Sequence, residues 1–524
     1  MKSIFFFLLC PLIIIAQPSN CDILIRNGKI IDGSGNSWFY GDVAIKEGKI
    51  VRVGRQLNFT ATKTIDATGL IVAPGFIDVH THLEGDELKD PNSTNFILDG
   101  VTTCITGNCG SSNIDIGKYL RWIDSLKLSI NVASLIGHND VRKEVMGKVN
   151  REATTNEMEQ MKAAIDKAMR DGAVGFSTGL IYIPGTYTKT PEIVELAKVA
   201  AKYNGVYATH MRDEGDSVTY AIDEALTVGR EAKIPVEISH FKLSGQQNWG
   251  RSKETVPMIE SARKQGIEVT IDQYPYTASS TNISTLIPDE ILADNQDSVN
   301  SRLQNPQTRK YVIDHMLQRL KKRNLKHFSY AVVAYYKTDT TYNGKSIEQI
   351  NLMKGNKHTK EKEAEVIVDI MMHGGASAVF HGMSEEDVKR IMRYPFNMFA
   401  SDASIREFGA GMPHPRGYGT NARVLAEYVR EQHVISLEEA IRRMTSLPAQ
   451  KFQLHDRGLL ATGYAADIVI FDENNVQDNS TYDHPHAYST GFKYVIVNGV
   501  LTVENEKHLG ARAGLALYGP GVLK

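Results

Sequence analysis

The central part of the chain alternates short apolar segments with longer segments of helical pattern. In the first of them, Ala73-Pro74-Gly75 marks a turn, and the residues from Phe76 to Val79 are strand formers. Seven further strand candidates follow, at residues 100–106, 130–137, 173–177, 205–210, 236–240, 267–272 and 397–402. Such alternation is typical of βα units, whose strands form a parallel sheet. The sequence therefore predicts an α/β fold built on parallel strands.

Residues that can bind a metal ion stand where several of these strands end. His80 and His82 are two positions apart, so an extended backbone would point both to one side, with Thr81 on the other. The other candidates are Cys109 after the second strand and, at the ends of the fifth, sixth and eighth strands, His210, His240 and Asp402. A single histidine at a strand end is more often a hydrogen-bonding loop residue, but this many coincidences favour a shared ion. Zinc accepts all three ligand types, and catalytic zinc keeps one position open for water.

The segment PGFIDVHTH resembles the first-strand signature of the amidohydrolase superfamily, which consists of metal-dependent hydrolases built on a (β/α)8 barrel. The resemblance implies such a TIM-like barrel over residues 73–455, with its chemistry at the carboxyl ends of the strands. Residues 283–375 interrupt the alternation after the seventh strand. A break of that length in a compact domain predicts an inserted lid or small subdomain.

Both ends of the chain have a sequence pattern that differs from the central βα alternation, with short predicted strands separated by glycines. Residues 22–72 and 456–505 carry this pattern, which is typical of hairpins. We expect the two segments to share a sheet, and the superfamily resemblance implies that they form a β-sandwich beside the barrel.

The first residues have the layout of a secretory signal peptide, with Lys2 followed by an apolar run that ends at Ala16. The run is too short to span a bilayer, so we expect cleavage of residues 1–16 and an exported protein, periplasmic or secreted, without a membrane span. Lipid anchoring at Cys21 is the alternative. Three cysteines would remain, which excludes a dense disulfide framework, and Cys104 within a strand is expected to be a buried, inert thiol. The formal net charge of -2 gives no reason to expect nucleic acid as a partner.

Five further motifs, GNCG, ATHMRDEG, ISHFKLSG, YPYTASST and SDAS followed by PHPRGYGT, resemble those of the N-acyl-D-amino-acid deacylases. This resemblance spans nearly all of the mature chain. It implies a tight zinc on Cys109, His210 and His240, a second, weaker site on His80 and His82, and Asp402 as the acid/base. It also implies that the substrate is an N-acylated D-amino acid whose carboxylate is bound by Tyr182, Lys242, Tyr274, Ser280 and Arg416.

The residue types suit that carboxylate. Arg416 offers a bidentate fork and Lys242 a point charge, while Tyr276 competes with Tyr274 because the YPY spacing does not choose between them. One departure from the family pattern is the segment SDASIREFGAGMPHPR, which places Arg406 before the arginine motif. We expect the pocket for the substrate side chain to differ accordingly.

These residues predict hydrolysis of a linear amide: zinc lowers the pKa of bound water toward about 7, and Asp402 moves the proton to the leaving amine. A cyclic amidase is the alternative, but the fourth strand ends in Gly175-Phe176-Ser177-Thr178, without a lysine to carbamylate as a bridging ligand. A catalytically silent binding protein on the same scaffold would be expected to lack a ligand, and none is missing. Side-chain preference and oligomeric state are not predicted.

Overall fold

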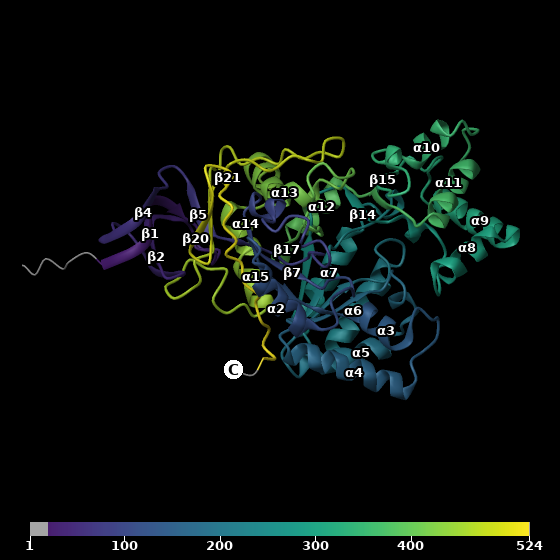
Figure 1. The fold of residues 1–524 in the computed structure, drawn as a ribbon, viewed down its shortest axis with the longest axis horizontal. Coiled ribbons are helices and arrows are strands. Elements are labelled where there is room, and N and C mark those ends of the chain that lie inside the picture. Colours follow the sequence, from purple (N-terminus) through teal and green to yellow (C-terminus); the bar gives the residue numbers. More distant parts are fainter. Residues whose placement is uncertain (1–18, 523–524) are drawn as a thin grey trace, which may run out of the picture.

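The structure is a computed structural model that describes residues 19–522 (Figure 1), so the expected signal peptide lies outside the described residues. At its centre, parallel strands from eight segments form a barrel. The strands are β6 (Phe76–Asp78), β7 (Val101–Thr106), β8 (Asn131–Ser134) continued by β9 (Ile136–Gly137), β10 (Gly175–Gly179), β11 (Val206–His210), β12 (Val236–Ile238), β13 (Val269–Gln273) and β17 (Asn397–Phe399). Each pairs in parallel with its neighbours, and Thr81 bridges Ala403 to join the first strand to the last. The predicted (β/α)8 barrel is confirmed.

Three of the strands are shorter than predicted. We expected strands up to His80, His240 and Asp402, but β6, β12 and β17 end two or three residues earlier. His240 and Asp402 have φ angles of 35° and 49°, in the left-handed region that a strand cannot contain. The backbone therefore turns where the polar side chains begin.

Amphipathic helices surround the barrel and bury their apolar faces against the strands. They are α1 (Thr94–Ile97), α2 (Ile116–Leu126), α3 (His138–Met146), α4 (Thr155–Arg170), α5 (Thr190–Ala201), α6 (Val218–Ala232), α7 (Ser252–Lys264), α12 (Glu385–Met392), α13 (Arg416–Arg423), the π-helical turn Val424–Glu431, α14 (Leu437–Met444) and α15 (Ser446–Lys451). In α4, for example, Met161, Ile165 and Met169 face inward. Among residues 19–522, no helix is both long and apolar enough to cross a bilayer.

The two chain ends build one nine-stranded sheet, seen as the purple and yellow strands of Figure 1. Its strands are β1 (Ser19–Ile30), β2 (Phe39–Lys46), β3 (Lys49–Gly54), β4 (Phe59–Asp66), β5 (Ile71–Pro74), β18 (Ile468–Phe471), β19 (Phe492–Val497), β20 (Val500–Glu504) and β21 (Lys507–His508). The junction is the antiparallel pair of β5 and β18. Isoleucines and valines from both ends share one core, so the sheet folds over itself as a sandwich. Cys21 is buried in β1.

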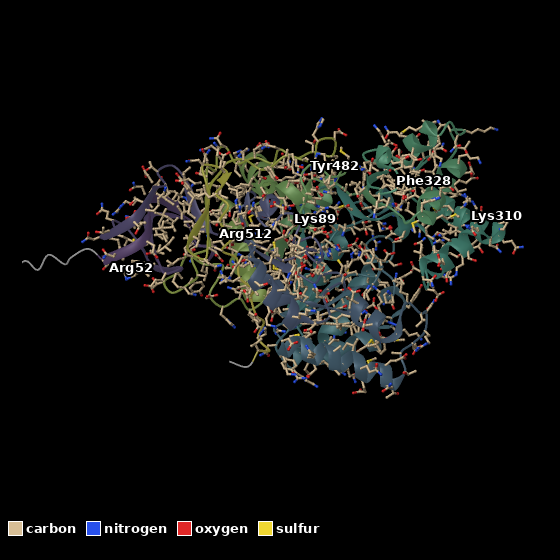
Figure 2. All side chains as sticks on the ribbon, in the orientation of Figure 1. Arg52, Lys89, Lys310, Phe328, Tyr482 and Arg512 are labelled. Atoms are coloured by element: carbon tan, nitrogen blue, oxygen red, sulfur yellow. The ribbon has the colours of Figure 1, made fainter. Side chains whose placement is uncertain are left out.

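The insertion after β13 is an ordered subdomain with its own apolar core. It contains an antiparallel sheet of β14 (Ala278–Asn282), β16 (Ser377–His381) and β15 (Ala331–Tyr335), with α8 (Gln296–Gln304), α9 (Pro306–Lys322), α10 (Ile347–Met353) and α11 (Lys360–Met372). Because Ala278 pairs with His381, the inserted sheet begins and ends outside the expected range of residues 283–375. Figure 2 shows Phe328 within this subdomain and Lys310 at its tip.

Candidate metal centre and active site

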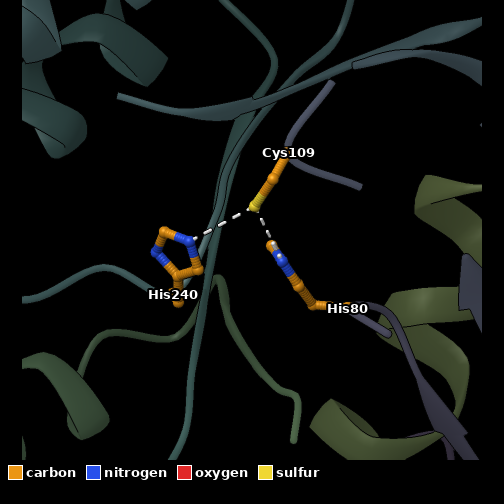
Figure 3. Close-up of side chains that lie close together, drawn as sticks. All are labelled: His80, Cys109 and His240. Carbon is orange, nitrogen blue, oxygen red and sulfur yellow. Dashed lines mark hydrogen bonds between the residues drawn. The ribbon is translucent and has the colours of Figure 1, made fainter. Parts of the chain in front are cut away.

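The strand-end residues converge on the sulfur of Cys109. Its Sγ lies 3.3 Å from His80 Nε2, 3.6 Å from His240 Nε2 and 3.6 Å from His210 Nδ1. Figure 3 shows the imidazoles of His80 and His240 with a nitrogen of each directed at this sulfur. All four residues are buried. The ligand atoms of His80, Cys109 and His240 all lie within 4.8 Å of one another, and His210 forms a second such group with Glu214 and His240.

A tight backbone loop carries the cysteine. Cys109 itself has a φ of 52°, and the flanking Gly107 and Gly110 have φ angles of 79° and 76°. A Cβ on Gly107 would lie 2.2 Å from the carbonyl oxygen of Leu135, so only glycine fits there. Ser177, in the middle of β10, accepts a hydrogen bond from the backbone N–H of Gly110 at 3.1 Å. The loop that follows β7 is thus held in place by its contacts with Leu135 and with Ser177 of β10.

Cys109, His240 and Asp402 share left-handed backbone conformations, which are uncommon for residues other than glycine. Such conformations cost roughly 1–3 kcal/mol each and cluster at functional sites. Three of them within one cluster of ligand-type residues indicate that the fold is organised to place these side chains.

The protonation chemistry of the cluster fits a cation. Burial lowers the pKa of His210 and of His240 well below the ordinary value, so both imidazoles are neutral and have a lone pair to offer. Burial, together with the charge of Asp402, raises the pKa of the Cys109 thiol well above its ordinary value when no ion is bound. A metal ion reverses that penalty, because a coordinating thiol is deprotonated. Neutral imidazoles around a buried sulfur are a donor set that zinc accepts.

Asp402 lies between the ligand cluster and a buried arginine. Its Oδ1 is 3.2 Å from His82 Nε2 and 3.7 Å from His80 Nε2, while its Oδ2 is 2.9 Å from Arg416 Nη1. Burial alone would raise its pKa, but the Arg416 guanidinium and the His82 contact hold the pKa of Asp402 well below its ordinary value. The carboxylate is therefore ionised at neutral pH and can accept a proton.

Behind the ligands lies a set of groups that orient them. Glu214 Oε1 is 2.9 Å from His240 Nδ1, and Lys242 donates to the same oxygen at 2.5 Å and to the His240 carbonyl at 2.7 Å. Lys242 Nζ also lies 2.7 Å from His240 Nδ1, where an ammonium can only donate. The tautomer with Nδ1–H directed at Glu214, which leaves the Nε2 lone pair facing Cys109, therefore requires Lys242 to donate to Glu214 and the His240 carbonyl instead. Asp272 plays the matching part for His80, with its Oδ2 3.4 Å from His80 Nδ1 and its Oδ1 accepting from the His240 backbone N–H.

Neither Glu214 nor Asp272 was singled out from the sequence. Asp272 ends the seventh predicted strand, so the rule that found His210 and His240 could also have found it. Glu214 stands four residues after His210 in the ATHMRDEG motif, in a loop that no periodicity places.

A second group of predicted residues lines the approach to the cluster. The guanidinium of Arg416 lies 4.5 Å from the centre of the Tyr274 ring, and its Nη2 donates to the carbonyl oxygen of Ser280 at 3.3 Å. The Tyr182 hydroxyl forms a hydrogen bond with the Thr281 hydroxyl at 3.0 Å. Tyr182 also lines a cavity of about 340 Å³ whose wall includes Cys109 and His82. These residues come together around the ligand cluster, whereas Lys242 lies behind His240.

The structure distinguishes the two tyrosines that the sequence left open. The Tyr276 hydroxyl donates to Asp478 Oδ2 at 2.8 Å, away from the cluster. Tyr274 is buried beside Arg416, and its hydroxyl has no hydrogen-bond partner within residues 19–522. Tyr274 is therefore the tyrosine with a free hydroxyl at the site.

A closed barrel of parallel strands that carries histidine, cysteine and aspartate ligands at its carboxyl ends defines a metal-dependent hydrolase. Comparison with known proteins agrees, since a model of the amidohydrolase family matches residues 63–503. The chain is 33% identical over 519 residues to a D-aminoacylase from Alcaligenes xylosoxydans xylosoxydans, covering 95% of this chain and 97% of that protein. An N-acyl-D-aspartate deacylase from the same organism is 34% identical over 524 residues, covering 95% of each chain.

A solved structure is similar over the same range. It is the N-acyl-D-glutamate deacylase of Bordetella bronchiseptica in complex with zinc and a phosphonate inhibitor that mimics the tetrahedral reaction intermediate. It is 32% identical, with a TM-score of 0.81 over 95% of this chain and 100% of that one. The chain belongs to the amidohydrolase family, in its D-aminoacylase branch.

Proposed function

We propose that this protein is a zinc-dependent deacylase that hydrolyses the amide bond of N-acyl-D-amino acids and releases a carboxylic acid and the free D-amino acid. The relatives named above act, by their names, on substrates of this class. Because those names differ in the amino acid, they support the class of substrate, and the preferred side chain of the substrate has to be measured.

The observation that carries the proposal is a set of buried donors without partners beside the ligand cluster. Arg416 Nε and the Tyr274 hydroxyl have no hydrogen-bond partner among the described residues, and Arg416 Nη1 faces Asp402 without hydrogen-bond geometry. A buried donor left unpaired costs about 1–3 kcal/mol. The α-carboxylate of an amino acid would satisfy both groups and match the fork of the guanidinium.

Cys109, His210 and His240 would hold the tight zinc, with His80, His82 and Asp402 beside it. Bound zinc would supply a water whose pKa is lowered to about 7 and would polarise the scissile carbonyl. Asp402, ionised and 3.2 Å from His82, takes the proton of the attacking water and returns it to the leaving nitrogen. Arg416, Tyr274 and the Ser280 segment fix the substrate carboxylate so that the amide faces Asp402. Lys242 and Glu214 keep His240 in the required orientation.

The cyclic-amidase alternative would require a lysine on β10 that can be carbamylated as a bridging ligand. That strand reads Gly175–Gly179 and presents no lysine, and the Ser177 side chain is used to hold the loop of Cys109.

Turnover of paired enantiomers tests the proposal. The zinc-loaded full chain should release free amine from N-acetyl-D-amino acids, and the matching L compounds should be at least tenfold poorer substrates. Acidic, basic and apolar side chains should be compared to define the pocket. Hydrolysis of a cyclic amide in preference to all of these linear compounds would contradict the proposal.

We further propose that the protein is exported after cleavage of residues 1–16. Lys2 and the apolar run that ends at Ala16 support this proposal. N-terminal sequencing of the protein purified from an exporting host should give a first residue of Gln17, whereas a lipid-modified Cys21 at the terminus would show the anchored alternative.

A further inference from the structure

The insertion contains a second group of ligand-type side chains, away from the catalytic cluster. Its members come from four segments: His327 precedes β15, Glu348 lies in the first turn of α10, His358 lies in the loop between α10 and α11, and Glu363 lies in the first turn of α11. Each offers one ligand atom, and these atoms all lie within 4.8 Å of one another. None of these residues has a part in the proposed hydrolysis.

The contacts within the group form a chain. His327 Nδ1 lies 2.6 Å from Glu363 Oε1 and 3.7 Å from Glu348 Oε1, and His358 Nε2 lies 2.6 Å from the same Glu348 oxygen. The two imidazole rings stack with their centres 4.3 Å apart. Glu363 is fully buried, and its other oxygen accepts from the backbone N–H of Phe328, the buried residue labelled in Figure 2.

Charge is poorly balanced in this arrangement. The two carboxylates have no ion-pair partners among residues 19–522 other than the two histidines. Glu363 is fully buried, and a buried carboxylate without a cation beside it is costly in an apolar setting. A divalent cation bound by two imidazoles and two carboxylates would balance the charge of both carboxylates.

We propose that His327, Glu348, His358 and Glu363 form a structural divalent-cation site of the zinc type. Two imidazole nitrogens and two carboxylate oxygens are a four-ligand set that zinc accepts. Tetrahedral bonds of about 2.0–2.1 Å place ligand atoms roughly 3.3 Å apart, so the two pairs now at 2.6 Å would move apart while the pairs farther apart, up to 4.8 Å, would close. His358, whose side chain is 49% exposed, can supply most of that movement and gives an ion access from solvent.

The site would fasten the insertion at one point. It would join the segment before β15 to the starts of α10 and α11, beside the apolar core that contains Phe328 and Ile347. β15 pairs with β16, and β16 pairs with β14, which carries Ser280 and Thr281 next to the active site. An ion here would therefore stabilise the sheet that faces the substrate, without contacting the substrate.

Metal analysis of the full chain tests the assignment. The parent, the double variant His327→Ala/His358→Ala, Cys109→Ala and His373→Ala are dialysed against metal-free buffer and titrated with zinc, and zinc per chain is measured by mass spectrometry. His373 is an exposed histidine of the same insertion outside the group, so it is the matched control. We expect one equivalent less in the double variant than in the parent, no change in His373→Ala, and retention of this equivalent in Cys109→Ala. Equal zinc content in the parent and the double variant would overturn the proposal.

Two further variants keep the test decisive if the double variant does not fold. His358→Gln changes a half-exposed side chain, and its loss of one equivalent with an unchanged circular dichroism spectrum would support the site, whereas full retention would overturn it. His358→Cys keeps a zinc ligand and should restore the equivalent. In the Cys109→Ala background, zinc should raise the thermal midpoint of the His373→Ala chain and leave that of the His358→Gln chain nearly unchanged, because a ligand that binds only the folded state stabilises it.

Discussion

The guanidinium of Arg416 lies 2.9 Å from the carboxylate of Asp402, so the group proposed to bind the substrate carboxylate also contacts the proposed base. Arg416 is buried, the Asp402 side chain is only 11% exposed, and Tyr274 packs against the guanidinium. One arginine can thus hold Asp402 ionised and present its remaining donors to the substrate. Because one residue has both roles, only experiments that vary the charge of the substrate can separate binding of the substrate carboxylate from support of Asp402.

Asp402→Asn should keep the shape of the site and remove its base. Proton transfer by a positioned side chain is worth roughly 10²- to 10⁴-fold, so turnover should fall by at least about 10²-fold. Zinc bound to Cys109, His210 and His240 should largely remain. Steady-state kinetics together with zinc content check this expectation, and a turnover within about threefold of the parent would assign the proton to another group.

Cys109→Ala should lose the tightly bound zinc and the activity together, because it removes one of three ligands. His240→Ala should behave in the same way. Cys104→Ala is the matched control, since that thiol is buried in the apolar core and should affect stability only. Elemental analysis of the purified variants decides the matter; full zinc retention in Cys109→Ala would exclude its sulfur as a ligand.

Much of this site was predictable because barrel topology brings strand ends together whatever lies between them. His80, His210 and His240 needed only the βα alternation and the rule that polar residues follow the strands. The motif resemblance then placed Arg416 and Tyr274, and the structure shows that they adjoin the ligands. The left-handed turns at His240 and Asp402 were not predicted, because they depend on contacts across the barrel such as the one from the His240 backbone to Asp272.

Lys242 shows where sequence reasoning was incomplete. Its position two residues after His240 predicts that it faces the substrate, but its ammonium lies behind His240, where it donates to Glu214 and to the His240 carbonyl. The sequence does not show that the loop of Glu214 returns to the loop after β12, where the Ser244 backbone N–H donates to the Glu214 carbonyl at 2.7 Å. That long-range contact brings a carboxylate to Lys242 and directs the ammonium to Glu214. The same limit applies to the insertion, which was expected as a lid or small subdomain and whose three-stranded sheet was not predicted.

The buried Asp478 should make stability depend on pH. Burial raises its pKa from 3.8 to about 6, although it accepts hydrogen bonds from Ser480 and Tyr276. The folded state therefore binds this proton more tightly than the unfolded state, so the contribution of Asp478 is greatest below pH 3.8 and is lost as the pH rises through 6. Asp478→Asn removes this dependence. Between pH 4 and 7, the stability of the parent relative to the variant should fall by up to about 3 kcal/mol.

Chemical denaturation of the parent and Asp478→Asn across that pH range measures the difference directly. Asp483→Asn, at an exposed aspartate five residues further along the chain, is the comparison variant that controls for the loss of one carboxylate. A parent-to-variant difference that stays constant or grows with pH would show that Asp478 is ionised throughout.

The double role of Arg416 gives a prediction that separates substrate recognition from support of Asp402. Arg416→Lys keeps the charge and loses the fork, while Arg416→Met loses both. Removing one partner of a buried charged pair typically costs about 2–5 kcal/mol, which is roughly 30- to several-thousand-fold in kcat/KM. For Arg416→Met we expect that loss with N-acetyl-D-amino acids and a much smaller loss with the matching amides, which carry no carboxylate. If Arg416 served only to hold Asp402, acids and amides would lose the same factor, since both need the base. An equal loss would therefore move the carboxylate-binding role to another cation, and Arg406, the departure from the family pattern, would be the first residue to substitute.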